Sequence, residues 1–229
     1  HGSRAKKAGI KEDDILISIN GNEIIESNII SVAVDRIGLA ESKPSIGAAL
    51  SATLKLTVIK PTFSIPRQAA VVVSVRAKNT SQVSEWIAAG TFYIDTRREV
   101  SVGNDIQTLE ISAFDAMAKA TADYPDTTHN WPYPAQSVVA EIASTIGVSV
   151  DSRTNAFLSA NYPVDLPLGY TMREILGFIA ASYVGSFIMS DEGKLRLVSL
   201  LDLPDAPTES LLADDVGDVI IFGTDAIIV

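Results

Sequence analysis

The stretch 169–200 constrains the fold of this chain more than any other, because its pattern predicts a capped helix followed by a β-hairpin. Thr171 lies where a helix N-cap is expected, and Glu174 follows at the spacing of a capping box. Apolar residues then recur at helical spacing: Ile175, Leu176, Ile179 and Tyr183. The expected helix therefore has one face to bury against a neighbouring element.

Glycine and acidic residues mark the end of this helix and the hairpin after it. Gly185 is predicted to be the left-handed C-cap residue. Strands are expected at Ser186–Met189 and Lys194–Leu200, with a turn at Asp191–Gly193 between them. We interpret the unit as scaffold rather than as a site of chemistry.

Short strand patterns dominate the region before residue 115. Ile15–Ile19 is predicted to be a strand that enters a hairpin at Asn20-Gly21-Asn22. Further strands are expected at Glu23–Ile25, Ile29–Arg36, Ala49–Ile59, Ala70–Arg76, Trp86–Ile94 and Gln107–Ala113. Turns are expected at Pro61, Pro66, 79–81, Gly90 and 103–105. Closely spaced short strands of this kind predict an antiparallel β-barrel or sandwich.

Helical patterns begin after residue 114. A short helix is expected at Asp115–Ala120, and a longer one at Ala135–Ile146 with Pro134 as its first residue and Gly147 as its end. Its buried stripe is predicted to be Val138, Val139, Ile142 and Ile146. The segment Asp151–Leu168 shows no regular pattern and is expected to be irregular.

These patterns predict a mainly β chain with an α+β part. The expected divisions are 1–11 (a cloning remnant at 1–3 and an N-terminal arm), 12–114 (antiparallel β-barrel domain), 115–205 (α+β domain) and 206–229. Pro204–Pro207 indicates a linker. Val219–Phe222 and Ala226–Val229 are predicted to form a hairpin, which we interpret as the start of a truncated second β-barrel.

Composition excludes several classes of protein. The 229 residues carry a formal net charge of −10, so phosphate backbones are not expected to bind. The chain has no cysteine, which excludes disulfides and thiolate chemistry. The sequence contains no apolar run of about 20 residues, so no membrane-spanning helix is expected.

Residues suited to chemistry are few. His129 could act as a metal ligand or general base, but no second ligand stands at a suitable spacing, and a packing histidine is the alternative. Trp86 and Trp131 could bind ligands or could fill core and interdomain space.

Acidic and glycine-rich segments also lack a recognised pattern. Asp214, Asp215 and Asp218 around Gly217 do not follow the alternating ligands and closing Glu of a calcium loop. Gly38 and Gly47 lack the Lys-Ser/Thr signature of a phosphate loop. The sequence therefore predicts no catalytic, cofactor-binding or metal-binding residue, no cofactor, and no enzyme activity.

Three segments, taken in order, resemble a known family. They are Ile15–Leu56, with its "IGAALSATL" pattern, Gly90–Lys119, with "GTFYIDTRRE" and "TLEISAFDAMAK", and Trp131–Leu200. The strongest match is Thr171–Gly193. Their order and spacing are similar to those of phage and prophage tail hub proteins, that is, the baseplate hub or tail-associated hub family, late control protein D-like.

That resemblance implies an architectural role. Hub proteins of this family carry two related β-barrels and form trimers around a channel at the tail tip, without catalytic residues in this region. The expected partners are other tail proteins: the tube or distal tail ring, the tape measure, and tip or receptor-binding proteins. The expected location is the virion tail, or the bacterial cytoplasm for a prophage product. An acidic channel wall would repel DNA and let it slide.

Three other functions are compatible with parts of the sequence. Ala8–Gly21 resembles a strand segment of PDZ domains and would imply a peptide-binding module, although the carboxylate-binding loop is missing. A tail-associated cell-wall hydrolase would need paired carboxylates or a nucleophile cluster. A carbohydrate-binding β-domain would be favoured by Trp86 exposed on a flat sheet face.

Overall fold

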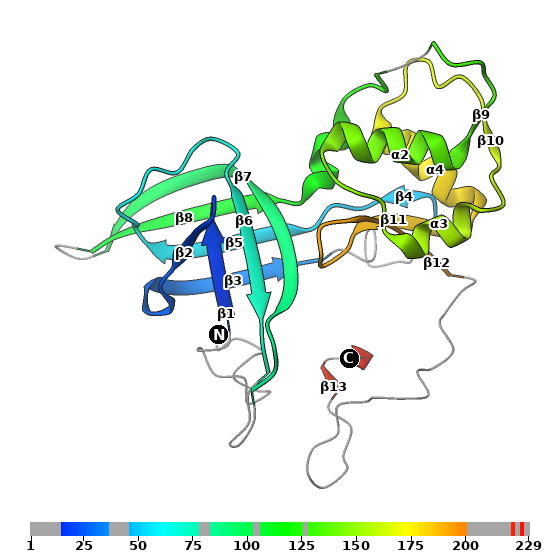
Figure 1. The fold of residues 1–229 in the computed structure, drawn as a ribbon. Coiled ribbons are helices and arrows are strands. Elements are labelled where there is room, and N and C mark those ends of the chain that lie inside the picture. The colour runs from blue at the N-terminus through cyan, green and yellow to red at the C-terminus, as the bar shows by residue number, and fades with distance from the viewer. Residues whose placement is uncertain are drawn as a thin grey trace, which may run out of the picture.

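The computed structural model describes residues 15–36, 46–77, 83–102, 106–125, 128–200, 221–222 and 225–226. Figure 1 shows two bodies, a curled β-sheet and a smaller group of helices over short strands. This architecture confirms the predicted class, mainly β with an α+β part. The expected arm at 1–11 and the linker at 204–207 lie outside the described residues.

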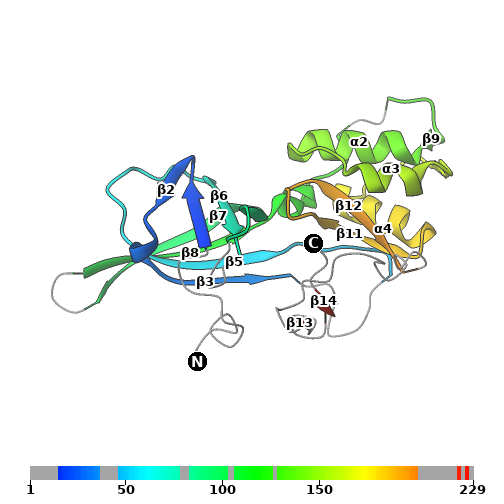
Figure 2. The same cartoon turned by 60° about the horizontal axis from the view of Figure 1, so that its bottom comes forward.

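The large sheet has seven strands in the order β2-β1-β6-β7-β8-β5-β3, and every neighbouring pair is antiparallel. Their bounds are β1 (Ile15–Ile19), β2 (Asn22–Ile24), β3 (Ile29–Asp35), β5 (Thr53–Ile59), β6 (Ala70–Val75), β7 (Ile87–Val102) and β8 (Ile106–Phe114). A 3₁₀ turn, η2 (Glu26–Asn28), connects the two edge strands β2 and β3. The sheet thus curls into a half-barrel (Figure 2).

Alternation along the strands builds the core of this half-barrel. In β5, Leu54, Leu56 and Val58 are at most 1% exposed, whereas Lys55 between them is exposed. Ile17 and Ile19 of β1 are fully buried in the same cluster. Period-2 patterning therefore separates a core face from a solvent face, as expected for an antiparallel sheet with one covered face.

Two turn predictions in this sheet had opposite outcomes. Asn20 and Gly21 have φ of 51° and 80°, the left-handed pair that a tight β-hairpin requires, so the predicted turn is confirmed. The predicted turn at Gly90 is wrong, because Gly90 lies inside β7, which continues to Val102. A Cβ at Gly90 would lie 2.7 Å from the ring of Phe92, so the glycine makes room for an aromatic side chain.

The strand predicted at Ala49–Ile59 is divided between two sheets. Its second half is β5, but Ala48–Ala49 forms a separate strand, β4, beside β11 (Gly185–Met189). The pairing is parallel and joins Ala48 to Ser186 and Ala49 to Phe187. A segment from the middle of the half-barrel sequence therefore completes the sheet of the second body.

That second body is a three-stranded sheet, β12-β11-β4, with helices gathered on one side (Figure 1). Its elements are η3 (Ala116–Thr121), β9 (Tyr133–Pro134), α2 (Ala135–Ile146), α3 (Ser152–Leu158), β10 (Pro163–Val164), α4 (Met172–Ser182), β11 (Gly185–Met189) and β12 (Leu195–Ser199). The predicted stripe of α2 is at most 2% exposed, and Gly147 ends the helix at φ 81°, so both predictions are confirmed.

Three local predictions in this body are corrected. The short helix after residue 114 is a 3₁₀ helix, η3, with Asp115 as its N-cap. Pro134 precedes α2 rather than starting it, because it pairs with Pro163 in the two-stranded β9–β10 ribbon. The region expected to be irregular contains the helix α3 and the strand β10.

Asp151 starts α3 and carries a pH-dependent part of the stability. Its carboxylate accepts from the Arg153 amide at 2.9 Å and pairs with the Arg153 guanidinium at 2.7 Å, which lowers the pKa of Asp151 to about 2. Because this value lies below the ordinary 3.8, the ionised form stabilises the fold above about pH 4, and the stabilisation is lost as the pH falls through about 2.

We therefore expect Asp151→Asn to lower the free energy of unfolding by about 1–2 kcal/mol near neutral pH. Urea unfolding followed by circular dichroism at a series of pH values measures the difference from the wild type. The difference should shrink toward zero below about pH 2.5. A difference that stays constant with pH would contradict the assigned role of the carboxylate.

The capping box of α4 is confirmed, but its predicted C-cap is wrong. Thr171 Oγ1 accepts from the Glu174 amide, and the Glu174 carboxylate accepts from the Thr171 amide at 2.8 Å. The helix ends at Ser182, and the left-handed residue after it is Val184, with φ 51°. Gly185 is instead the first residue of β11 and pairs with Ser199.

Helix α4 crosses β4 at two glycines. A Cβ on Gly177 would lie 2.7 Å from the carbonyl oxygen of Gly47, and a Cβ on Gly47 would lie 3.0 Å from the Cβ of Ala181. The backbones of helix and strand therefore approach more closely than side chains would allow. Gly47 serves this packing, which explains the small residues of the "IGAA" segment.

Gly177→Ala separates this contact from helix propensity. Alanine is favoured over glycine by about 1 kcal/mol in a helix, but forcing a methyl group against backbone typically costs about 1–3 kcal/mol. We expect a net loss of about 1 kcal/mol in the free energy of unfolding by urea. Ser144→Ala on the exposed side of α2 is the control and should not destabilise. A Gly177→Ala protein more stable than wild type would refute the close crossing.

Asp115 fastens the two bodies together where β8 passes into η3. Its buried carboxylate accepts from Ser51 Oγ and the Ala52 amide, both at 2.7 Å, and from the Met117 amide at 3.0 Å. The Arg173 side chain of α4 donates to the carbonyl of Ala49 at 2.8 Å nearby. The connections from β4 to β5 and from β8 to η3 thus meet at one carboxylate.

Two further observations concern the chain as a whole. Ile221–Phe222 (β13) and Asp225–Ala226 (β14) pair antiparallel, as in the predicted C-terminal hairpin, but Asp225 belongs to the second strand rather than to the turn. The other residues of the predicted strands lie outside the described residues. None of the helices in the described part is long and apolar enough to cross a bilayer.

Candidate interaction groove

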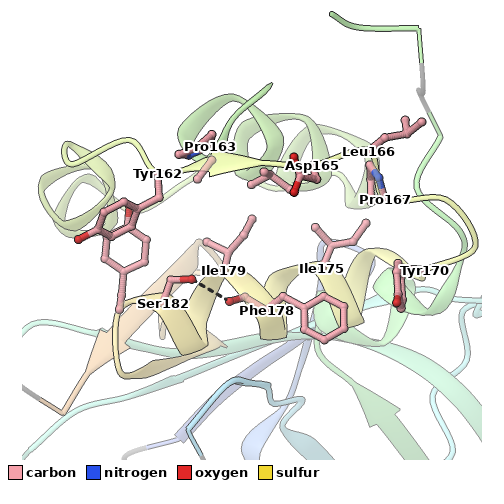
Figure 3. Close-up of a pocket in the computed structure, with 13 residues that line it drawn as sticks. Tyr162, Pro163, Asp165, Leu166, Pro167, Tyr170, Ile175, Phe178, Ile179 and Ser182 are labelled. Carbon is pink, nitrogen blue, oxygen red and sulfur yellow. Dashed lines mark hydrogen bonds between the residues drawn. The ribbon is translucent and has the colours of Figure 1, made fainter. Parts of the chain in front are cut away.

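The described residues contain no group of three or more His, Asp or Glu side chains placed to hold a metal ion. A groove of about 320 Å³ lies between α4 and residues 162–167, and we call it the α4 groove. Figure 3 shows Ile175 and Ile179 pointing from α4 toward this facing segment. Both are at most 4% exposed and form an apolar floor.

Pairs of aromatic rings lie at the two ends of the α4 groove. Tyr162 and Tyr183 have ring centroids 5.2 Å apart, and Tyr170 meets Phe178 edge to face at 5.1 Å. The β9–β10 ribbon holds the upper wall through the pairing of Val164 with Tyr133. The groove is therefore built on a helix and a short ribbon rather than on a free loop.

Large apolar side chains around this groove face solvent. Their exposed fractions are 57% for Phe178, 49% for Tyr162, 44% for Tyr170, 40% for Leu166 and 65% for Leu168. Single exposed apolar residues are ordinary, but several of them beside a concave surface are typical of a binding site. Phe178 in particular stands on the solvent side of an otherwise amphipathic helix.

The two candidate aromatics of the loop before α2 lie in one packed cluster. His129 stacks on Tyr133 with centroids 4.2 Å apart and pairs with Glu141 of α2 at 3.0 Å. Trp131 meets the rings of Tyr124, His129 and Tyr133 edge to face. This arrangement fits the packing interpretation of both residues, since it ties the loop to α2.

Trp86 does not lie within a strand of the sheet, and one side of its ring is covered. It lies just before β7 and is 42% exposed, and the guanidinium of Arg76 stacks on its ring at 4.4 Å from the centroid. The carbohydrate-binding alternative therefore loses the observation that would have favoured it.

The remaining sequence candidates divide between described and undescribed residues. Asp214, Asp215, Asp218, Gly38 and residues 8–14 of the PDZ-like segment lie outside the described residues. Among residues 15–36, 46–77, 83–102 and 106–114, no α-helix stands beside β1 to form a PDZ-type groove. The turn acids Asp191 and Glu192 make ion pairs with Arg36 and Lys194 respectively.

The architecture has counterparts among solved structures. A tail protein from Neisseria meningitidis MC58 superposes with a TM-score of 0.54 at 14% sequence identity, over 80% of this chain and 50% of that one. The chain shares the fold of this tail protein. The 43 kDa tail protein of prophage MuSo2 from Shewanella oneidensis matches at a TM-score of 0.49 and 15% identity, over 81% of this chain and 52% of that one.

Both matches concern shape rather than sequence. The chain spans about half the length of these two tail proteins. No family model matches the sequence, and no curated protein is significantly similar to it. The tail-protein fold is therefore recognised through the arrangement of its strands and helices.

Sequence reasoning missed the α4 groove. It treated 151–168 as irregular and so had no second wall to place opposite α4. A signal was present in Phe178, which falls outside the predicted apolar face of the helix, and in the neighbouring Leu166 and Leu168. Apolar residues on the wrong face of a well-capped helix could have indicated a contact surface.

Proposed function

We propose that this chain is a structural component of a phage or prophage tail. The observation that carries the proposal is the shared fold with the meningococcal tail protein over 80% of the chain. The exposed apolar surface around the α4 groove supports a role that depends on contacts with other proteins. In this proposal the chain acts through shape and contact, without catalysis and without a cofactor.

The finer proposal is a hub position at the baseplate or tail tip. There the chain would join the tail tube to the tip as a trimer, together with tube or distal-ring, tape-measure and receptor-binding proteins. Its net charge of −10 would suit the wall of a DNA exit channel, because like charge keeps the genome from adhering. The corresponding location is the virion tail, or the bacterial cytoplasm before assembly from a prophage.

Labelling of tailed particles tests the tail role. Antibody raised against the chain and carried on gold should mark particles from the source bacterium at the tail end remote from the head. Deletion of the gene should yield particles with incomplete tails. Tails that assemble normally and carry no label would refute the proposal.

Light scattering tests the finer claim separately. The hub arrangement predicts the mass of a trimer for the intact protein. A monomer would refute the trimer while leaving the tail role to be decided by labelling.

A further inference from the structure

A single charged side chain lies among the residues that line the α4 groove. This is Asp165, on the wall opposite Ile175 and Ile179 (Figure 3). Its side chain is exposed, and within the described part of the chain it makes no hydrogen bond or ion pair. The hydroxyl of Ser182 at the same groove is occupied, because it donates to the carbonyl of Phe178 at 3.3 Å. The groove thus presents an apolar floor, aromatic ends and one unused carboxylate.

We propose that the α4 groove binds a short segment of a partner protein in which a Lys or Arg stands next to a large apolar residue. The apolar side chain would lie on Ile175 and Ile179 between the aromatic pairs. The cation would pair with the exposed carboxylate of Asp165 at the wall of the groove. The contact needs one apolar anchor and one charge, a common pattern for the centre of a small interface.

The size of the groove limits the occupant. Its volume of about 320 Å³ is at the small end of the ~300–1,000 Å³ range of ligand pockets. Such a space accepts one or two side chains of an extended segment. Anionic ligands are disfavoured by Asp165, and they would also meet a chain whose formal net charge is −10.

The same charge argues for a different protein rather than a second copy. If the groove met its counterpart in a second copy, two Asp165 carboxylates would come together, and their like charge opposes that arrangement. A basic segment is attracted both by the whole chain and by Asp165 in the groove. The inference rests on the groove and on this charge, so it and the proposed tail role can fail independently.

Nuclear magnetic resonance of the full chain with labelled isoleucine methyl groups provides the test. The probe is an acetylated and amidated heptapeptide with a central lysine flanked by leucines, and the matched peptide carries glutamate instead of lysine. The lysine peptide should shift the signals of Ile175 and Ile179 but not that of Ile17, which is buried in the half-barrel. We expect about tenfold weaker binding of the glutamate peptide.

Substitutions separate the charge from the apolar contact. Asp165→Asn should reduce the preference for lysine to about twofold or less, whereas Phe178→Ser should weaken both peptides. The controls are Asp95→Asn and Ile30→Ser, which change exposed residues of β7 and β3 in the other body and should leave binding unchanged.

Several results would overturn the inference. Equal binding of the two peptides, or a lysine preference that survives Asp165→Asn, would show that the carboxylate does not select the ligand. Absence of saturable shifts at Ile175 and Ile179 up to about 10 mM peptide would show that the groove does not bind such segments. A dimer in light scattering that Phe178→Ser dissociates would identify a second copy as the occupant.

Discussion

Alanine in place of Gly185 is expected to lower the free energy of unfolding by about 3 kcal/mol. A Cβ at this position would lie 2.4 Å from the carbonyl oxygen of Val198 and 3.0 Å from the Cα of Ser199, both on the facing strand β12. The obstacle is backbone, which cannot rotate away as a flexible side chain can. In calorimetry the melting temperature should fall by about 6–12 °C for a chain of this size.

Val184→Gly is the matched substitution next to it. Val184 holds φ 51°, which a β-branched residue adopts only with strain, so glycine should raise the free energy of unfolding by about 1 kcal/mol. Gly185→Asn distinguishes the two interpretations of Gly185, because asparagine tolerates a left-handed cap but not a blocked strand position. If Gly185→Asn is as stable as wild type, the packing argument is wrong.

Loss of the Asp115 carboxylate is the second large expected effect. Asp115→Ala leaves the Ala52 and Met117 amides and the Ser51 hydroxyl without their acceptor at a buried junction. Unpaired buried donors of this kind should lower the free energy of unfolding by about 3 kcal/mol in urea. Asp95→Ala on the exposed part of β7 is the control and should change stability little.

The free energy of unfolding of Asp115→Asn should lie between those of the wild type and Asp115→Ala. An amide oxygen at the Oδ1 position can still accept from Ser51 and Met117, but the amide nitrogen would then face the Ala52 amide. Burial raises the pKa of Asp115 above 3.8, so its ionised form costs stability that is recovered as the pH falls through the folded-state pKa toward 3.8. The asparagine variant should lack this component. Equal stability of the alanine and asparagine variants would contradict the hydrogen-bonding role.

Local sequence signals were sufficient to predict the elements whose ends are fixed by a turn or capping motif. Asn20-Gly21 determined the β1–β2 turn, and Thr171 with Glu174 determined the start of α4. In each case a few adjacent residues impose the backbone conformation. The half-barrel followed from alternation, since a sheet with one covered face repeats every second residue.

Other features depend on contacts between distant residues, and no local pattern specifies them. Gly185 is an example, because the facing strand β12 leaves no room for a side chain there. Gly90 differs in that it makes room for the ring of Phe92, a close neighbour in its own strand. Glycine marks close approach as well as turns, and the sequence does not say which. Helix α3 is short and begins with polar residues, so its sequence shows little helical periodicity. Its N-cap residue, Asp151, was the one local signal that a helix starts there.

The candidate site was missed for the same reason. The α4 groove forms only when residues 162–167 lie opposite α4, and Asp165 gains meaning from that placement. The interpretations of His129 and Trp131 needed no such knowledge, because the absence of companion ligands already favoured packing. The sequence was therefore sufficient to argue against a catalytic or metal site at His129 and Trp131, but it was not sufficient to locate the contact surface.

The parallel pairing of β4 with β11 has a consequence for synthesis of the chain on the ribosome. At a synthesis rate of about 5–20 residues per second, roughly ten seconds pass between the synthesis of β4 and that of its partner strand β11. Throughout that interval the hydrogen-bonding groups of β4 have no strand to join. Gly47, Ala48 and Ala49 offer little apolar surface to other nascent chains during the wait. The small residues that let α4 approach thus also leave little apolar surface exposed at this strand before the chain is complete.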